Sequence, residues 1–202
     1  QQGHLAAAAW SAGHLELLDR PFLAWHLSGG TTELLLIRPD GISVQAEILG
    51  GTEDISAGQL IDRTGVRLGL AFPAGKAVDQ LSRQAKKDLR FPVKLREFSF
   101  SLSGMENKME QLIQRGEDPA DVARFTLNVV CDTVAKVTER AMERHPGLPV
   151  LCSGGVASNA QLREVLTRRC KALFAQPQYS TDNAMGTAIL TWRALERQEG
   201  RL

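Results

Sequence analysis

Two apolar runs in this 202-residue chain each end in the same tripeptide, Ser-Gly-Gly. The first is Ser28-Gly29-Gly30 after Phe22 to Leu27, and the second is Ser153-Gly154-Gly155 after Leu148 to Cys152. Paired glycines let backbone N–H groups approach an oxyanion closely, and a helix N-terminus adds the positive end of its dipole. Together the two loops predict a nucleotide held by its phosphates and sugar. Each loop alone also fits a tight turn at a strand end.

The spacing of apolar residues predicts the element order β-β-β-α-β-α-β-α. Strands are expected at Phe22 to Leu27, Thr32 to Ile37, Ile42 to Leu49, Pro149 to Cys152 and Ala172 to Ala175. Helices are expected at about Glu53 to Leu70, from Asp118-Pro119 to His145, at Ala157 to Cys170 and at Asn183 to Arg197. The first three strands should form an antiparallel meander, extended by two parallel strands.

This order is that of the ribonuclease-H-like α/β fold. Two packed copies of that fold make the actin, Hsp70 and sugar-kinase (ASKHA) superfamily, in which the nucleotide lies between the copies. We expect residues 1–18 to be the tail helix of a missing N-terminal lobe, because the Ala-rich stretch from Gly3 to Ser11 is helical in pattern. Residues 19–202 would be the C-terminal lobe, with a helical insertion at about 73–117 in which Ala77 to Lys87 is expected to be a helix.

The composition argues against a membrane-spanning protein and against a disulfide-stabilised one. Hydrophobic residues make up 43% and charged residues 23%, with a formal net charge of +1, so nucleic-acid binding would need a local basic patch. No apolar stretch approaches the roughly 20 residues of a membrane span. Cys131, Cys152 and Cys170 stand in apolar surroundings without a CxxC pair, which favours the cytoplasm over a disulfide framework.

Short motifs along the whole chain resemble the tRNA N6-adenosine threonylcarbamoyltransferases (TsaD and relatives, once described as O-sialoglycoprotein endopeptidases). In order, they are Gly3-His4, Ser28-Gly29-Gly30, Ser56-Ala57-Gly58 leading to Asp62-Arg63, Leu68-Gly69-Leu70 with Pro73-Ala74-Gly75, Phe100-Ser101-Leu102-Ser103-Gly104, Ser153-Gly154-Gly155-Val156-Ala157-Ser158-Asn159, and Thr181-Asp182-Asn183. Each motif is weak by itself, and their order and spacing are specific.

The resemblance implies a site for an adenine nucleotide, either ATP/ADP or threonylcarbamoyl-AMP. The implied contacts are Asp62 and Gly75 on the ribose and adenine side, Gly154, Gly155 and Asn159 in an adenosine loop, and Ser28, Gly29, Gly30 and Thr31 in a phosphate loop. It also implies that the protein works on tRNA with TsaB-like and TsaE-like proteins of a modification complex.

The resemblance further implies that His4 and Asp182 are catalytic residues that bind one iron or zinc ion. The family's second histidine stands four residues before this one, a position that precedes Gln1. Such an ion would polarise the carbamoyl group carried on AMP, while the exocyclic amine of an adenosine next to the tRNA anticodon attacks.

Several positions depart from the family pattern. Thr31 replaces a histidine, Ile55 replaces one of two acidic residues and leaves Asp54, Gln59 replaces a glutamate, and Glu106 replaces a lysine. These changes keep the loop shape and alter the charges near the phosphates. Two rivals to the transferase therefore stand: a non-catalytic nucleotide-binding scaffold, and an ATPase or acyl kinase of the same superfamily. The second needs a carboxylate for Mg²⁺ or water, and the single Asp54 makes it less attractive.

The residues with implied roles also have simpler interpretations. Asp182 and Asn159 each stand where a helix N-cap is expected. His4 on an Ala-rich helix is typical of a packing histidine with satisfied hydrogen bonds, and Asp62 within a helix is typical of a charge that faces solvent.

The remaining charged and imidazole residues suggest no further site. The basic run from Arg83 to Arg96 favours a solvated face over a tRNA contact. His14, His26 and His145 share no ligand spacing, and the absence of HExxH leaves the old peptidase label without chemistry.

Overall fold

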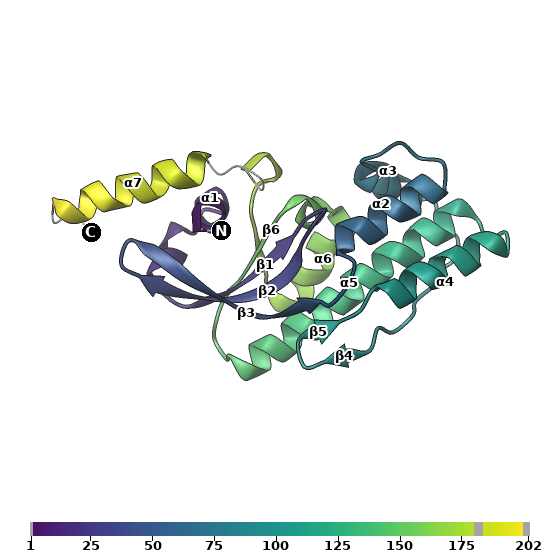
Figure 1. Ribbon diagram of the computed structural model, residues 1–202, viewed down its shortest axis with the longest axis horizontal. Helices are drawn as coiled ribbons and strands as arrows, with labels where there is room; N and C mark the ends of the chain where they lie inside the picture. Colours follow the sequence, from purple (N-terminus) through teal and green to yellow (C-terminus); the bar gives the residue numbers. More distant parts are fainter. Residues whose placement is uncertain (1, 180–183, 200–202) are drawn as a thin grey trace.

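A mixed sheet of seven strands runs through the molecule in the order β4-β5-β3-β2-β1-β6-β7 (Figure 1). The computed structural model describes residues 2–179 and 184–199. The strands are β1 (Phe22–Leu27), β2 (Thr32–Asp40), β3 (Ser43–Thr52), β4 (Leu95–Arg96), β5 (Ser99–Phe100), β6 (Val150–Ser153) and β7 (Leu173–Phe174). Strands β1 to β3 are antiparallel, and β6 and β7 continue the sheet in parallel from β1. The predicted ribonuclease-H-like arrangement is therefore confirmed.

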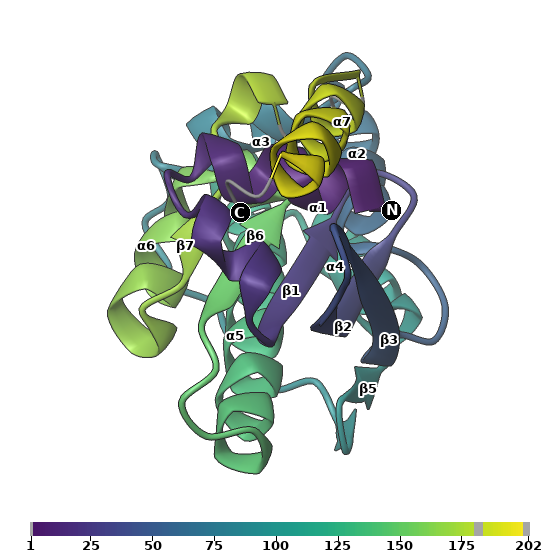
Figure 2. The same ribbon diagram turned by 90° about the vertical axis from the view of Figure 1, so that its left-hand side faces the viewer.

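Helices cover both faces of this sheet. They are α1 (Gln2–Ser11), α2 (Ala57–Arg67), α3 (Gly75–Ser82), α4 (Ser103–Gln114), α5 (Pro119–Arg144), α6 (Ala160–Cys170) and α7 (Ala184–Gln198), with short 3-10 turns at Leu15–Asp19, Gly155–Ser158 and Pro177–Tyr179. Figure 2 shows α1 and α7 on one side of the sheet and α5 on the other. None of the helices in the described ranges is long and apolar enough to cross a membrane.

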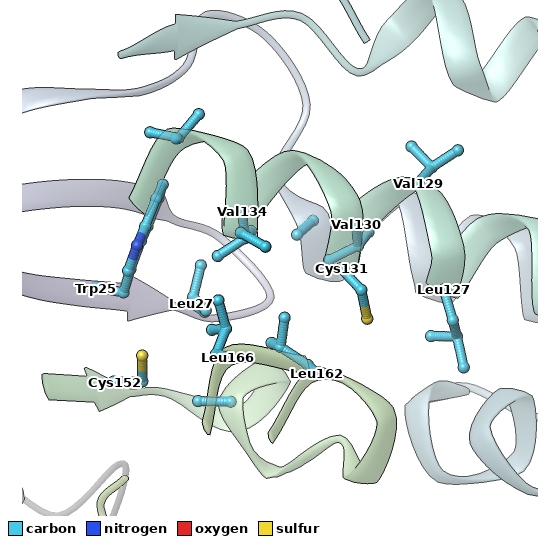
Figure 3. Close-up of a cluster of buried hydrophobic side chains, with 14 of the residues drawn as sticks. Trp25, Leu27, Leu127, Val129, Val130, Cys131, Val134, Cys152, Leu162 and Leu166 are labelled. Carbon is cyan, nitrogen blue, oxygen red and sulfur yellow. The ribbon is translucent and has the colours of Figure 1, made fainter. Parts of the chain in front are cut away.

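The alternation of side chains along β1 divides the core in two. Leu23, Trp25 and Leu27 face α5 and α6, where they pack among residues such as Val134 and Leu166 (Figure 3). The indole Nε1 of Trp25 donates a hydrogen bond to Thr138 Oγ1 over 2.8 Å, which satisfies the polar end of a fully buried ring. The intervening residues, Phe22 and Ala24, face α1 and α7 in the second cluster. The period of two thus fixes which face every β1 residue meets.

Helix α1 lies directly against α7. A Cβ atom placed on Gly186 would lie 1.7 Å from the backbone oxygen of Gly3, so the two helices touch through their backbones at this point. Arg193 lies about two turns further along the same face of α7. It is almost fully buried, and its guanidinium donates 2.5 and 3.3 Å hydrogen bonds to the Asp19 carboxylate. These contacts hold both helices over the same face of the sheet.

Two helix boundaries differ from the sequence prediction for physical reasons. Helix α2 starts at Ala57 rather than near Glu53 because Ser56 and Gln59 form a capping box, each side chain bonding the other residue's backbone N–H. Helix α3 covers Gly75–Ser82 instead of Ala77 to Lys87. It ends early because the Asp121 carboxylate accepts the N–H groups of Lys86 and Lys87, at 2.7 and 2.9 Å.

Candidate nucleotide and metal site

The first Ser-Gly-Gly loop is a compact turn at the end of β1. Ser28 N–H donates to the Thr31 oxygen over 2.8 Å, and Ser28 Oγ accepts the N–H of Thr31 over 3.0 Å. Ser56 Oγ donates to the Gly29 oxygen over 2.6 Å and ties the loop to the start of α2. No heavy atom stands within 4 Å of a Cβ position on Gly29 or Gly30, so space for a ligand remains beside both glycines.

The two Ser-Gly-Gly loops contact each other. A Cβ atom on Gly154, whose φ is +94°, would lie 2.2 Å from the Leu27 oxygen. A Cβ atom on Gly58 would lie 2.5 Å from the Ser28 oxygen on the other side. Strands β1 and β6 are parallel neighbours, so both loops follow carboxyl ends at the same edge of the sheet, where α/β proteins bind ligands. Only glycine fits at these two contacts, which explains Gly154 and Gly58 without reference to a ligand.

Three predicted nucleotide contacts meet around α3. Asp62 Oδ1 accepts the N–H of Ala74 over 2.8 Å, next to Gly75 at the start of α3. Asn159 Nδ2 donates to Asp79 on α3 over 2.9 Å. The interpretation of Asp62 as a charge that only faces solvent is therefore wrong, because it anchors this helix. The interpretation of Asn159 as an N-cap is confirmed, since its Oδ1 accepts the N–H of Leu162 in the first turn of α6.

A cavity of about 580 Å³ adjoins the first loop. Its lining includes Gly29, Asp62 and the ring of Phe72, which is 73% exposed. This volume lies within the range of small-molecule sites. The two arginines in its wall are paired with α4, Arg63 to Glu106 over 2.7 Å and Arg67 to Glu110. Glu106, one of the departures from the family pattern, thus neutralises a nearby cation instead of adding one.

A second, smaller cavity of about 280 Å³ lies between α1 and the sheet. It is lined by His4, His26, Thr31 and Glu33, together with Leu5, Leu35 and Ser153. The Nδ1 atom of His4 is buried here without a hydrogen-bond partner among the described residues. An unpaired buried group of this kind costs about 1–3 kcal/mol. The interpretation of His4 as a packing histidine with satisfied hydrogen bonds is therefore wrong. A buried imidazole nitrogen without a partner is the kind of atom that can bind a metal ion.

His26 also lines this cavity, although its spacing from the other histidines along the chain predicts no shared site. Its ring centroid lies 6.3 Å from that of His4, with the rings tilted by 39°. Burial lowers the pKa of His26, as does the neighbouring His4, while the Glu33 carboxylate opposes the shift. The imidazole is therefore neutral at pH 7. The alternation along β1 could have predicted this position, because His26 is on the same face of the strand as Phe22 and Ala24, the face that packs against α1.

Asp182 lies outside the described residues, as do Thr181 and Asn183. Its predicted roles as a metal ligand and as a helix cap therefore both stay predictions. Within residues 2–179 and 184–199, no group of three or more His, Cys, Asp or Glu side chains is arranged to hold a metal ion.

Both carboxylate oxygens of Asp54 accept hydrogen bonds from residues at the start of α4. Its Oδ1 accepts the N–H of Leu102 over 2.8 Å, and its Oδ2 accepts Ser101 Oγ over 2.5 Å and the N–H of Ser103 over 3.2 Å. Burial raises the pKa of Asp54, but the hydrogen bonds from both serines and from these N–H groups outweigh burial and hold the pKa well below its usual range. The carboxylate works as a helix cap.

The basic run on the far side of α3 is ion-paired at three of its positions. Arg83 contacts Asp79 over 2.8 Å, and Lys87 contacts Glu117 over 2.6 Å. Arg90 donates to the Asp132 carboxylate over 2.9 Å. These pairs fit the prediction of a solvated face, and a tRNA contact there stays untested.

The topology and the paired glycine loops together define an ASKHA-type α/β domain. Solved structures with this fold include full-length HypF in its phosphate- and nucleotide-bound form, with a TM-score of 0.75 and 12% identity over 97% of this chain and 43% of that one. A second is the (R)-2-hydroxyglutaryl-CoA dehydratase component A of Acidaminococcus fermentans, with a TM-score of 0.54 and 15% identity over 95% and 69% of the two chains.

Comparison of sequences identifies the family, which the fold alone does not. Residues 2–189 match the family model described as TsaD, tRNA N6-adenosine threonylcarbamoyltransferase, and the chain belongs to this family. The enzyme of that name from Thermus thermophilus is 34% identical over 97% of this chain, and its counterpart from Listeria innocua is 37% identical over 75%. The chain spans 59% of the first relative's length, and the second alignment covers 46% of its relative.

Proposed function

We propose that this chain forms part of an enzyme that transfers a threonylcarbamoyl group from its AMP adduct to the exocyclic amine of an adenosine next to the tRNA anticodon. Family membership supports the class of reaction. The observation that carries the proposal is the parallel pairing of β1 with β6, which brings two glycine-rich loops to one edge of the sheet. Such loops suit a ligand that carries both a phosphate and a nucleoside.

The proposed ligand is an adenine nucleotide, either ATP/ADP or threonylcarbamoyl-AMP. Its phosphate would accept N–H groups from the open side of Gly29 and Gly30. Its nucleoside would lie toward α3, near Gly75, Gly155 and Asn159. The second oxygen of Asp62, Oδ2, accepts no hydrogen bond from the described part of the chain, so it remains available to a ribose hydroxyl.

The proposed metal ligands are His4 and Asp182. The unpartnered Nδ1 of His4 supports the first assignment, because a neutral imidazole nitrogen is a preferred ligand of iron and zinc. Iron or zinc bound there would supply Lewis-acid polarisation of the carbamoyl oxygen. The other residues hold the nucleotide in place, so that the loops and α3 position the AMP leaving group.

The proposal includes tRNA as the substrate, and TsaB-like and TsaE-like proteins as partners in the modification complex. It places the enzyme in the cytoplasm. The three cysteines are free and buried, which suits a reducing compartment.

A non-catalytic nucleotide-binding scaffold is the second candidate. Two departures from the family pattern have structural roles here, since Gln59 completes the capping box of α2 and Glu106 pairs with Arg63. An ATPase or acyl kinase is disfavoured, because both oxygens of Asp54 already accept hydrogen bonds from the residues at the start of α4.

The test is genetic rescue of a strain that lacks the modified adenosine. The gene that encodes this chain should restore the modification, measured by mass spectrometry of digested tRNA, and a His4→Ala version should not. Rescue by neither gene, with both proteins present and able to bind ADP, would establish the scaffold instead. Rescue by both would remove His4 from the catalytic site.

A further inference from the structure

An exposed aromatic ring stands beside the first Ser-Gly-Gly loop. Phe72 is 73% exposed, the highest fraction of any large hydrophobic side chain among residues 2–179 and 184–199. It lines the cavity of about 580 Å³ together with Val66, which is 53% exposed, and with Gly29 of the loop. Neighbouring apolar side chains that are left open to water at a cavity indicate a surface that a ligand or a partner covers.

The rest of the cavity wall is one stripe of α2. Its five residues recur at the three- and four-residue spacing of one helix face: Gln59, Asp62, Arg63, Val66 and Arg67. Leu60 and Ile61 lie on the opposite face of α2 and are buried in the first core cluster. The stripe therefore takes no part in core packing, and its side chains are available to a ligand.

The two arginines of this stripe are already paired with carboxylates of α4. Arg63 pairs with Glu106, and Arg67 pairs with Glu110. In each pair the carboxylate is the more buried side chain, with 13% and 30% exposed against 44% and 50% for the arginines. The guanidinium groups are thus held in place with their charge balanced. This arrangement disfavours a phosphate group, and it leaves planar faces on which a flat ring can stack.

Gln59 adds an oriented polar group to the same wall. Its Oε1 atom accepts the N–H of Ser56 over 2.9 Å in the capping box of α2, which fixes the amide. Its Nε2 atom donates no hydrogen bond to the described part of the chain, so it remains available as a donor. A donor beside an aromatic ring and guanidinium planes suits a nucleobase, which has flat faces and polar atoms along its edge.

We infer that this cavity receives an unpaired base of the tRNA anticodon loop, with its ring stacked on Phe72. The inference rests on the proposed function, in which an adenosine beside the anticodon reaches the carbamoyl group near the first loop. Gly29 belongs both to that loop and to the cavity wall, so a base next to this adenosine comes close to Phe72. The nucleoside of the AMP adduct is proposed to lie elsewhere, toward α3, and none of Gly75, Gly155 and Asn159 lines the cavity.

The experiment measures how the 202-residue chain binds an RNA hairpin with the sequence of an anticodon stem and loop, by fluorescence anisotropy. The variants are Phe72→Ala and Phe72→Tyr, and the matched control is Phe91→Ala, an exposed ring whose centroid lies 4.1 Å from Lys108 Nζ. Phe72→Ala should weaken binding at least about fivefold, because stacking on the ring is lost. Phe72→Tyr and Phe91→Ala should bind as the parent chain does.

A second set of hairpins, in which each loop nucleotide in turn lacks its base, locates the contact. Removal of the base next to the target adenosine should weaken binding to the parent chain by the same factor. Phe72→Ala should then add no further loss, because ring and base belong to one interaction. Losses that multiply would overturn the inference, and so would a parent chain that does not bind the hairpin.

Calorimetry with ADP distinguishes the RNA base from the nucleotide. Equal ADP affinity in the parent chain and Phe72→Ala is expected, whereas a weaker affinity in the variant would overturn the inference and assign the cavity to the adenine of the nucleotide. None of these measurements involves group transfer. Failure of genetic rescue would therefore count against the proposed function alone, and unchanged hairpin binding by Phe72→Ala would count against base stacking alone.

Discussion

Asn159 donates a 2.9 Å hydrogen bond to Asp79 and so joins the first turn of α6 to α3. The same side chain caps α6 through its Oδ1 atom, which accepts the N–H of Leu162. One amide thus connects the second Ser-Gly-Gly loop with the helix that Asp62 anchors from the other side. Geometry on the nucleoside side of the proposed site depends on this residue.

Asn159→Ala should therefore affect both stability and binding. Loss of the cap should lower the free energy of unfolding by about 1 kcal/mol, measured by urea denaturation. Loss of a polar partner should weaken ADP binding by on the order of 1–3 kcal/mol, measured by calorimetry. Asn159→Asp is the matched control, because it keeps the cap oxygen and faces Asp79 with a like charge. Equal ADP affinity in the parent and Asn159→Ala would remove this residue from the site.

The glycines of the second loop should differ sharply in their tolerance of a methyl group. Gly154→Ala should lower the free energy of unfolding by at least about 2 kcal/mol, because Gly154 has φ +94° and its Cβ would collide with the Leu27 oxygen. Gly155→Ala is the control, since no heavy atom stands within 4 Å of its Cβ position. Urea denaturation of both variants measures the difference. Similar losses in the two would show that the loops do not interlock.

Stability should fall in acid through His26. Its pKa in the folded chain lies below the ordinary value of 6.5, so below that pH the unfolded chain binds more protons than the folded one. The free energy of unfolding then rises with pH in this window, and the stabilisation is lost as the pH falls from 6.5 through the folded pKa. His26→Leu should flatten the slope, as measured by urea denaturation at several pH values without metal. A slope unchanged by the substitution would contradict this account.

Asp182→Ala should separate metal binding from helix capping. If Asp182 is a metal ligand, the variant protein should lose its iron or zinc by elemental analysis and should no longer modify tRNA. Its fold should persist, because a lost N-cap costs only about 1 kcal/mol. Normal tRNA modification by Asp182→Ala would leave this residue as a cap alone.

Much of the fold could be predicted from periodicity, because burial imposes a pattern on the strands. The run from Phe22 to Leu27 became β1 without change, and Asp118-Pro119 opened α5 as the sequence indicated. The ends of α2 and α3 could not be placed in this way. They depend on the side chains of Gln59 and Asp121, which accept hydrogen bonds from backbone N–H groups, and Asp121 belongs to a distant part of the chain.

The candidate site was predictable where it depends on glycine and hidden where it depends on tertiary contact. Paired glycines marked both loops, and the structure requires a glycine at Gly154, which has no room for a Cβ atom beside Leu27, and at Gly58, which has none beside Ser28. The proximity of His4 and His26 could not be predicted from their spacing in the sequence, because His4 is on helix α1 and His26 is on strand β1, opposite Glu33 on β2. Only the stacking of α1 on the sheet brings the two rings together.

The close approach of Gly3 and Gly186 leaves no room between the backbones of α1 and α7 at this point. His4 is the next residue after Gly3, so the place where α7 packs also fixes the position of this imidazole over the sheet. Helix α7 therefore helps to set the shape of the cavity lined by His4 and His26, although it contributes no lining residue.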